Sequence, residues 1–184
     1  VGFGSGGLFA NTAVAEVRTN RAQSHIETVT PALSAQIDSV WRDDTDDPVL
    51  IRVAARTGHP AAAARARALL TDSGTKSELR LNLVQLLGEL GDPADAERLL
   101  QLIGNAPEPL QLAALDALPT FDFPTLAPEL IRRYPKLNDR VRARVRQVLL
   151  SRKSWAQEIL RQVDAGRLPA ADFAVEQLRV VALH

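Results

Sequence analysis

Four arginines at alternate positions form the strongest local charge feature of the chain. They are Arg140, Arg142, Arg144 and Arg146, and further basic residues lie on both sides of them. On a helix, Arg140 and Arg144 share one side, and Arg142 and Arg146 share another. Guanidinium groups bind phosphates and carboxylates through paired N–H donors. The expected helix over 138–153 is therefore a candidate surface for an anionic partner, either a nucleic acid or an acidic protein.

The alternative for this stretch is a solvated helix face whose arginine stems cover apolar neighbours. No aromatic residues interleave with the arginines, as stacking on bases would require. The 22 basic and 22 acidic residues of the whole chain also cancel, which disfavours a generally basic nucleic-acid binder. We therefore favour the solvated face and keep anion binding as the alternative.

A run of acidic residues, Asp43-Asp44-Thr45-Asp46-Asp47, has the donor chemistry for calcium. The EF-hand pattern requires alternating ligands, a glycine for the turn and a distal glutamate, and this run lacks that glycine. Pro48 follows at once and suits the first position of a helix. We predict an acidic turn in which Asp47 caps the next helix.

Other residue types that support catalysis or cofactor binding occur without the pattern that such chemistry needs. The Gly-rich stretch from Gly2 to Gly7 lacks the preceding strand of a phosphate-binding loop. His25, His59 and His184 stand in no metal or triad motif. The chain has no cysteine, which excludes disulfides, thiolate metal sites and c-type haem attachment within it. The sequence thus predicts no catalytic residue, cofactor or metal site, and the segment is not expected to be an enzyme.

The elements that would position these residues follow from a repeat of bulky apolar pairs. Five such pairs begin 29, 30, 31 and 29 residues apart: Val40-Trp41, Leu69-Leu70, Leu99-Leu100, Leu130-Ile131 and Ile159-Leu160. A fixed period of this length is typical of stacked repeats, in which each unit buries its apolar face against the next. Apolar residues recur at helical spacing, and no segment alternates as a strand would. We predict an all-α fold, an α-solenoid of about five antiparallel helix pairs.

Prolines and short polar residues indicate where the helices begin. First helices are expected near Pro31, Pro60, Pro93, Pro124 and Ser154, and second helices near Pro48, Thr75, Pro107, Asn138 and Pro169. Proline suits the first helical position, and Thr75 and Ser154 each open a sequence that fits the capping box. Residues 1–30 are predicted to hold a Gly-rich linker over 1–11 and a leading helix over 12–29. One repeat domain is expected over 31–184.

Two features of the chain bear on its cellular context. No apolar run reaches the length of a membrane span, and no secretory leader is recognisable. Residues 177–184 still read as helix without a stop signal, and the chain contains no methionine. We expect the segment to be excised from a longer protein, with its repeat domain truncated at the C-terminal end.

The expected helix pairs resemble HEAT-type repeats, and the sequence from Asp139 to Leu150 (DRVRARVRQVLL) is similar to their second helix, D-x-VR-x-x-A. A closer resemblance covers most of the chain and is densest over 149–169 (LLSRKSWAQEILRQVDAGRLP) and 176–184 (EQLRVVALH). These segments resemble the membrane-bound dehydrogenase or haem-binding proteins of the planctomycete type, which are large exported bacterial proteins. In that family a dehydrogenase-like β-propeller precedes HEAT-like repeats, and a c-type cytochrome follows them.

The resemblance implies that residues 31–184 are a HEAT-like scaffold or docking module between a dehydrogenase domain and its electron acceptor, in the periplasm or cell envelope. Its partners would be other domains of the same polypeptide or a separate protein. The cofactor residues of that family have no counterparts in this segment. The parent protein would then be an oxidoreductase, while this segment carries no cofactor of its own.

Overall fold

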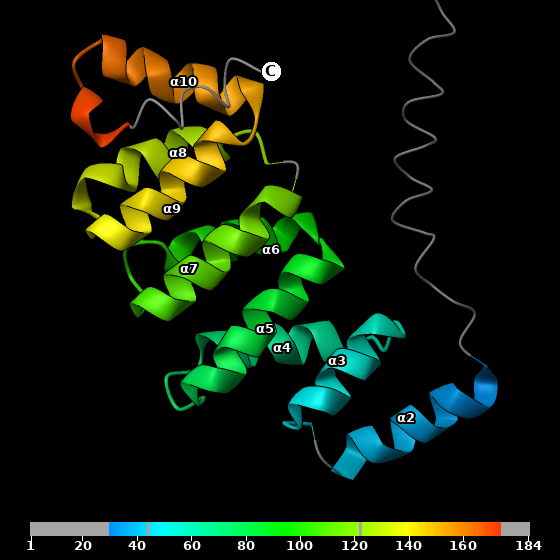
Figure 1. Ribbon diagram of the computed structural model, residues 1–184. Helices are drawn as coiled ribbons and strands as arrows, with labels where there is room; N and C mark the ends of the chain where they lie inside the picture. The colour runs from blue at the N-terminus through cyan, green and yellow to red at the C-terminus, as the bar shows by residue number, and fades with distance from the viewer. Residues whose placement is uncertain (1–29, 44, 122, 174–184) are drawn as a thin grey trace, which may run out of the picture. The chain divides into compact units, whose positions relative to one another are not determined.

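The computed structural model describes residues 30–43, 45–121 and 123–173 (Figure 1). Over these ranges the regular structure is entirely helical and contains no strand, which confirms the predicted all-α class. The expected linker over 1–11, leading helix over 12–29 and helix over 177–184 lie outside the described residues. The described helices are α2 (Pro31–Asp43), α3 (Pro48–Arg56), α4 (Ala62–Thr71), α5 (Ser77–Leu90), α6 (Pro93–Leu102), α7 (Glu108–Ala117), α8 (Leu126–Arg133), α9 (Asp139–Leu150) and α10 (Lys153–Asp164).

Side-chain caps begin three of these helices where the sequence predicts them. The Asp47 carboxylate accepts a hydrogen bond of 2.7 Å from the backbone N–H of Leu50 at the start of α3. Asp92 caps α6 in the same way, and Asn138 caps α9. Each cap satisfies an amide that the helix itself leaves without a partner. The acidic run at 43–47 therefore contains a helix cap, as expected for Asp47.

Two capping boxes expected from the sequence do not form. Helix α5 begins at Ser77 and α10 at Lys153, and neither has a side-chain capping bond. The Thr75 hydroxyl is instead buried without a hydrogen-bond partner. A second helix expected near Pro169 is represented, within the described residues, by a 3₁₀ turn at Ala170–Asp172. The two capping-box sequences therefore predicted the regions in which α5 and α10 begin. They did not predict how those helix starts are capped.

The chain divides into two compact units, residues 1–65 and 66–184, and the boundary falls within the sequence of α4. In the first unit, Ile37 and Trp41 of α2 are buried, as are Ile51 and Ala54 of α3. The ring of His59 lies 4.7 Å from the Trp41 ring, measured between centroids. These contacts form a small core of the first unit around α2 and α3.

In the second unit, the helices expected to come second in each pair are neighbours. Helix α5 contacts α7, and α7 contacts α9. Helix α10 contacts both α8 and α9, beside which it lies in Figure 1. Helices α5 and α7 approach closely at Gly88, where an added Cβ atom would lie only 2.7 Å from the Cβ atom of Ala117. Glycine is required at this position because no larger side chain fits between the two helices.

The recurring apolar pairs supply much of the core, although not uniformly. Both members are buried in Leu69-Leu70 and Leu99-Leu100. In the next two pairs, Leu130 and Ile159 are fully buried while the residue after each is half-buried. The first pair differs, because Trp41 is buried and Val40 is exposed. The repeat thus marks at least one inward-facing residue in each helix that carries it.

Candidate functional site

The arginine helix α9 places its four predicted site residues against acceptors of the same chain. Arg140 and Arg144 both reach α7: Arg140 Nη1 lies 3.0 Å from Glu108 Oε1, and Arg144 Nη2 lies 2.6 Å from Asp116 Oδ1. Arg142 pairs with Asp139 on α9 itself. Arg146 donates from Nη1 to the Tyr134 hydroxyl at 2.6 Å. Arg140 and Arg144 therefore lie on the same side of α9, as predicted, because both pair with carboxylates of α7.

This pairing changes the electrostatic character of the arginine stretch. Glu108, Asp116 and Asp139 supply a carboxylate to three of the four guanidinium groups. Arg140 keeps 74% of its side chain exposed, so it retains N–H donors toward solvent. Anion binding by Arg140, Arg142, Arg144 and Arg146 stays a prediction. An anionic partner would have to displace the carboxylates that already pair with these arginines, or bind the N–H donors that the carboxylates leave exposed.

Tyr134 is a buried residue whose hydroxyl takes part in a polar cluster. It lies in the 3₁₀ turn Tyr134–Lys136 after α8 and is almost completely buried. Its hydroxyl donates to Asp172 Oδ2 at 2.8 Å and accepts from Arg146 Nη1. Burial raises the pKa of Tyr134, the hydrogen bond from Arg146 opposes this shift, and the hydrogen bond to Asp172 adds to it. The three residues connect the turn after α8, helix α9 and the turn after α10.

We expect Tyr134 to ionise at a higher pH than an unperturbed tyrosine. Because its pKa is raised in the folded state, the unfolded chain loses this proton first. The stability contributed by the neutral hydroxyl is then complete below the ordinary pKa of about 10, and it is lost as pH rises through the folded-state pKa. Tyr134 is the only tyrosine of the chain, so phenolate absorbance in an alkaline titration reports it alone. A midpoint at or below the ordinary value, while circular dichroism still shows native helix, would contradict this arrangement.

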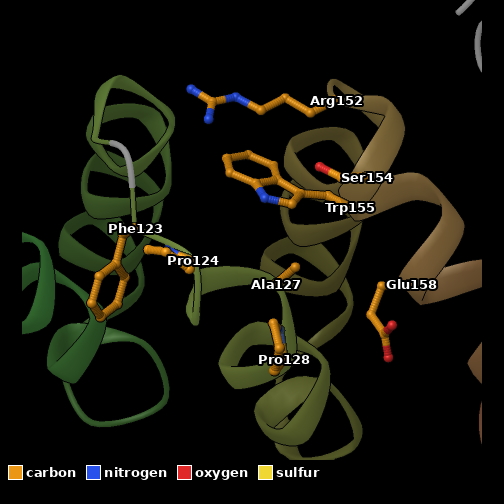
Figure 2. A pocket seen from close by; sticks show the side chains of 8 residues that line it. All are labelled: Phe123, Pro124, Ala127, Pro128, Arg152, Ser154, Trp155 and Glu158. Carbon is orange, nitrogen blue, oxygen red and sulfur yellow. The ribbon is translucent and has the colours of Figure 1, made fainter. Parts of the chain in front are cut away.

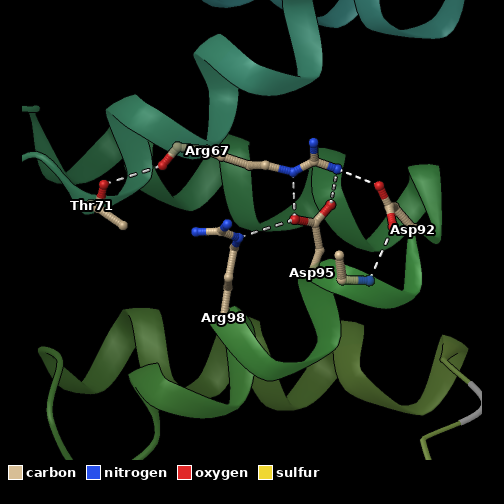
Figure 3. Close-up of polar contacts among 6 residues, drawn as sticks. Arg67, Thr71, Asp92, Asp95 and Arg98 are labelled. Atoms are coloured by element: carbon tan, nitrogen blue, oxygen red, sulfur yellow. Dashed lines mark hydrogen bonds and ion pairs between the residues drawn. The ribbon is translucent and has the colours of Figure 1, made fainter.

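A second polar cluster joins α4 and α6 in the second unit (Figure 3). Arg67 of α4 makes two hydrogen bonds to the Asp95 carboxylate, at 2.7 Å and 2.9 Å. Arg67 Nη2 also donates to Asp92 Oδ2 at 2.6 Å. Asp95 is completely buried, and it is the one buried charged residue among those that the structure describes. Arg98 approaches the same carboxylate less closely, at 3.8 Å.

Asp95 lies in the first turn of α6, where the helix N-terminus attracts negative charge. The hydrogen bonds to Asp95 in turn raise the pKa of Arg67. Removing one partner of a buried ion pair is strongly destabilising, so we expect Arg67 and Asp95 to have a structural role. Sequence analysis missed this pair. The sequence feature that could have indicated it is the position of Asp95, four residues before Leu99 and thus on the same face of the helix.

The third candidate is a hollow of about 370 Å³ beside α8 and α10 (Figure 2). Its lining includes Phe123, Pro128 and the buried indole of Trp155. Arg152 lies over that indole, 4.3 Å from the ring centroid, and donates to the Pro119 carbonyl. Glu158, at the other side, is paired with Arg161 at 3.1 Å. The hollow is thus lined by both polar and apolar groups, and its two charged residues already have partners.

Three further findings bear on function. Within 30–43, 45–121 and 123–173, no cluster of His, Asp or Glu side chains has a composition and size that could hold a metal ion. None of the described helices is long and apolar enough to cross a membrane. Comparison with protein-family models, curated proteins and solved structures finds no match to this chain.

Proposed function

We propose that this chain is a non-catalytic α-solenoid of HEAT-like helix pairs that serves as a scaffold or docking module. The observation that carries the proposal is the sequence separation of its polar contacts. In the second unit, most side-chain hydrogen bonds between different helix pairs join residues about one repeat apart. The apolar pairs of the sequence recur every 29–31 residues, and these contacts span 25–33 residues, apart from the bond from Tyr134 to Asp172, which spans 38.

Four contacts illustrate this relation. Arg67 and Asp95 are 28 residues apart, and Arg144 and Asp116 are also 28 apart. Thr120 Oγ1 donates to the Gly88 carbonyl over 32 residues, and Arg152 donates to the Pro119 carbonyl over 33. In a stacked-repeat protein each unit contacts chiefly its neighbours, so contacts at one period are what such a stack produces. In a helical bundle without repeats, the sequence separation of such contacts is not expected to recur at one value.

The docking function is inferred from this architecture. Stacked helix pairs present an extended, rigid surface, and such surfaces bind other proteins in many unrelated systems. The resemblance over 149–169 and 176–184 supports a particular setting, in which the module links a dehydrogenase-like domain to a c-type cytochrome domain in an exported polypeptide. Its partners would be those flanking domains, and its location the periplasm or cell envelope. The parent protein would be an oxidoreductase.

The coding sequence on both sides of this segment tests the redox setting. The proposal predicts a β-propeller-type sequence upstream and a haem-attachment motif, Cys-x-x-Cys-His, downstream. A reading frame that contains neither would overturn the redox setting. Cross-linking of the full-length polypeptide, followed by mass spectrometry, tests the docking role itself. We expect links from Lys136 and Lys153 to the flanking domains, and their absence would argue against docking through this end of the module.

The arginine helix provides the alternative function, binding of nucleic acid or an acidic partner. The high exposure of Arg140 is the observation in its favour. Titration with double-stranded DNA and with RNA at two salt concentrations separates the two functions. Binding through several phosphates would weaken steeply with salt, by about tenfold or more between 50 and 200 mM. The scaffold proposal predicts no such salt-dependent binding, and its appearance would favour the alternative.

A further inference from the structure

Charge is unevenly distributed along the second unit. Residues 66–125 contain four Lys and Arg against nine Asp and Glu, whereas residues 126–164, from the start of α8 to the end of α10, contain ten against four. Two carboxylates of α7 pair with Arg140 and Arg144 of α9, and the helices from α8 to α10 still keep an excess of positive charge. Such an excess attracts a partner of opposite charge and steers its approach.

The hollow of about 370 Å³ lies within this basic part, beside α8 and α10 (Figure 2). Its volume falls at the lower end of the range of about 300–1,000 Å³ that is typical of ligand sites. Phe123, Pro124 and Pro128 line it with apolar surface that solvent still reaches, and the buried Ala127 and Trp155 line it from the core. The hollow therefore has the size and the apolar lining to receive one large apolar side chain.

Two charged residues line the hollow, and they differ in what they contact. Glu158 is paired with Arg161 at 3.1 Å. Arg152 donates from Nη2 to the Pro119 carbonyl, and no carboxylate of the described residues pairs with it. A guanidinium carries five N–H donors, so Arg152 retains donors for an incoming carboxylate. The exposed Ser154 adds a hydroxyl to the same lining.

Starting from the docking function proposed above, we propose that this hollow is the anchor site for an acidic segment of the partner protein. The segment inserts one large apolar side chain into the hollow and brings an adjacent carboxylate to Arg152, where the two form a charge-assisted pair. Charge complementarity selects this occupant, because α8–α10 would repel a basic segment and Arg152 has no carboxylate from the described residues. A few anchor side chains that fill pockets carry most of the affinity of protein interfaces.

The test uses a defined probe and the full chain. The probe is an acetylated five-residue peptide with phenylalanine at its centre and two glutamates on each side, labelled with a fluorophore. Fluorescence anisotropy measures its dissociation constant. One comparison peptide carries glutamine in place of every glutamate, and another carries alanine in place of the phenylalanine. We expect each change to weaken binding by about tenfold or more, because the first removes the charge-assisted pair and the second removes the apolar anchor.

Variants of the protein locate the binding site. Arg152→Gln should remove most of the preference for the glutamate peptide over the glutamine peptide. Arg140→Gln removes the same charge from an arginine that is 74% exposed and does not line the hollow, so the preference should persist.

A second pair of variants tests the apolar anchor without changing Arg152. Ser154→Leu adds bulk at an exposed position of the lining and should weaken binding of the phenylalanine peptide by about tenfold. Gln157→Leu, at an exposed position of α10 outside the hollow, should leave it unchanged. Circular dichroism of each variant verifies that the helices are intact.

Three results would each overturn the anchor site. They are equal affinity for the glutamate and glutamine peptides, a preference that Arg152→Gln leaves intact, and binding that Ser154→Leu does not weaken. Double-stranded DNA that displaces the peptide and loses affinity in Arg152→Gln would assign the hollow to a nucleic acid instead. The docking function is judged separately, by the cross-links of the full-length polypeptide, so a peptide that does not bind would overturn the anchor site alone.

Discussion

Replacing Arg67 with alanine is expected to lower the free energy of unfolding by about 3–5 kcal/mol, the typical cost of leaving a buried charge without its partner. Asp95 is completely buried and receives two hydrogen bonds from Arg67. Without that guanidinium the buried carboxylate loses both of these hydrogen bonds, and a buried polar group without its partner destabilises the fold. Chemical denaturation followed by circular dichroism measures the change.

Two controls separate the buried pair from general loss of charge. Arg98→Ala removes an arginine that is half exposed and 3.8 Å from the same carboxylate, so it should cost no more than about 1 kcal/mol. Arg67→Leu combined with Asp95→Leu removes both charges and should recover most of the stability, since apolar replacement of a buried ion pair is often neutral. If Arg67→Ala behaves like Arg98→Ala, then Asp95 is not buried as described.

Gly88→Val is expected to destabilise the protein by about 2–3 kcal/mol through overpacking between α5 and α7. An added Cβ atom alone would lie 2.7 Å from Ala117 Cβ, and valine adds two methyl groups beyond it. The helices must then separate or the side chain must leave its preferred rotamer. The hydrogen bond from Thr120 Oγ1 to the Gly88 carbonyl would be strained by the same separation. The melting temperature and denaturant midpoint should both fall.

The matched control introduces the same residue elsewhere on α5. Gln85 lies on the exposed side of this helix, so Gln85→Val carries the helix-propensity cost of valine without a steric clash. That cost is about 0.5 kcal/mol. Equal effects of the two substitutions would mean that α5 and α7 are not in close contact at Gly88.

The helix positions were largely predictable because their signals are local. Proline at the first helical position and a carboxylate just before it specify the start of α3 and α6 within a few residues of sequence. The capping box at Thr75 failed because a non-local effect intervened, and Ser154 lies inside α10 and not before its start. Where the chain enters α5, the side chain that could cap is buried, so tertiary packing rather than the local pattern decides the first residue of the helix.

The polar contacts of Arg140, Arg144 and Asp95 were not predictable, because their partners lie about one repeat away in sequence. The spacing of Arg140 and Arg144 showed that they share a side of a helix, but it could not show that this side faces Glu108 and Asp116. The same limit hid the partner of Asp95. Asp95 stands four positions before Leu99 on the buried face of α6, but only the hydrogen bonds in the fold identify Arg67 of α4 as its partner. Sequence therefore predicts the charged residues, and packing determines whether they remain free for a partner.

Hydrogen–deuterium exchange of Gly88→Val, compared helix by helix with the unmodified chain, tests most directly whether the second unit is a stack of repeats. In a stack, stability is shared chiefly between neighbours. The account predicts that amides of α5 and α7 lose most protection, that α9 loses less, and that α10 is nearly unchanged. A uniform loss of protection from α5 through α10 would show one cooperative globular core and would contradict the account.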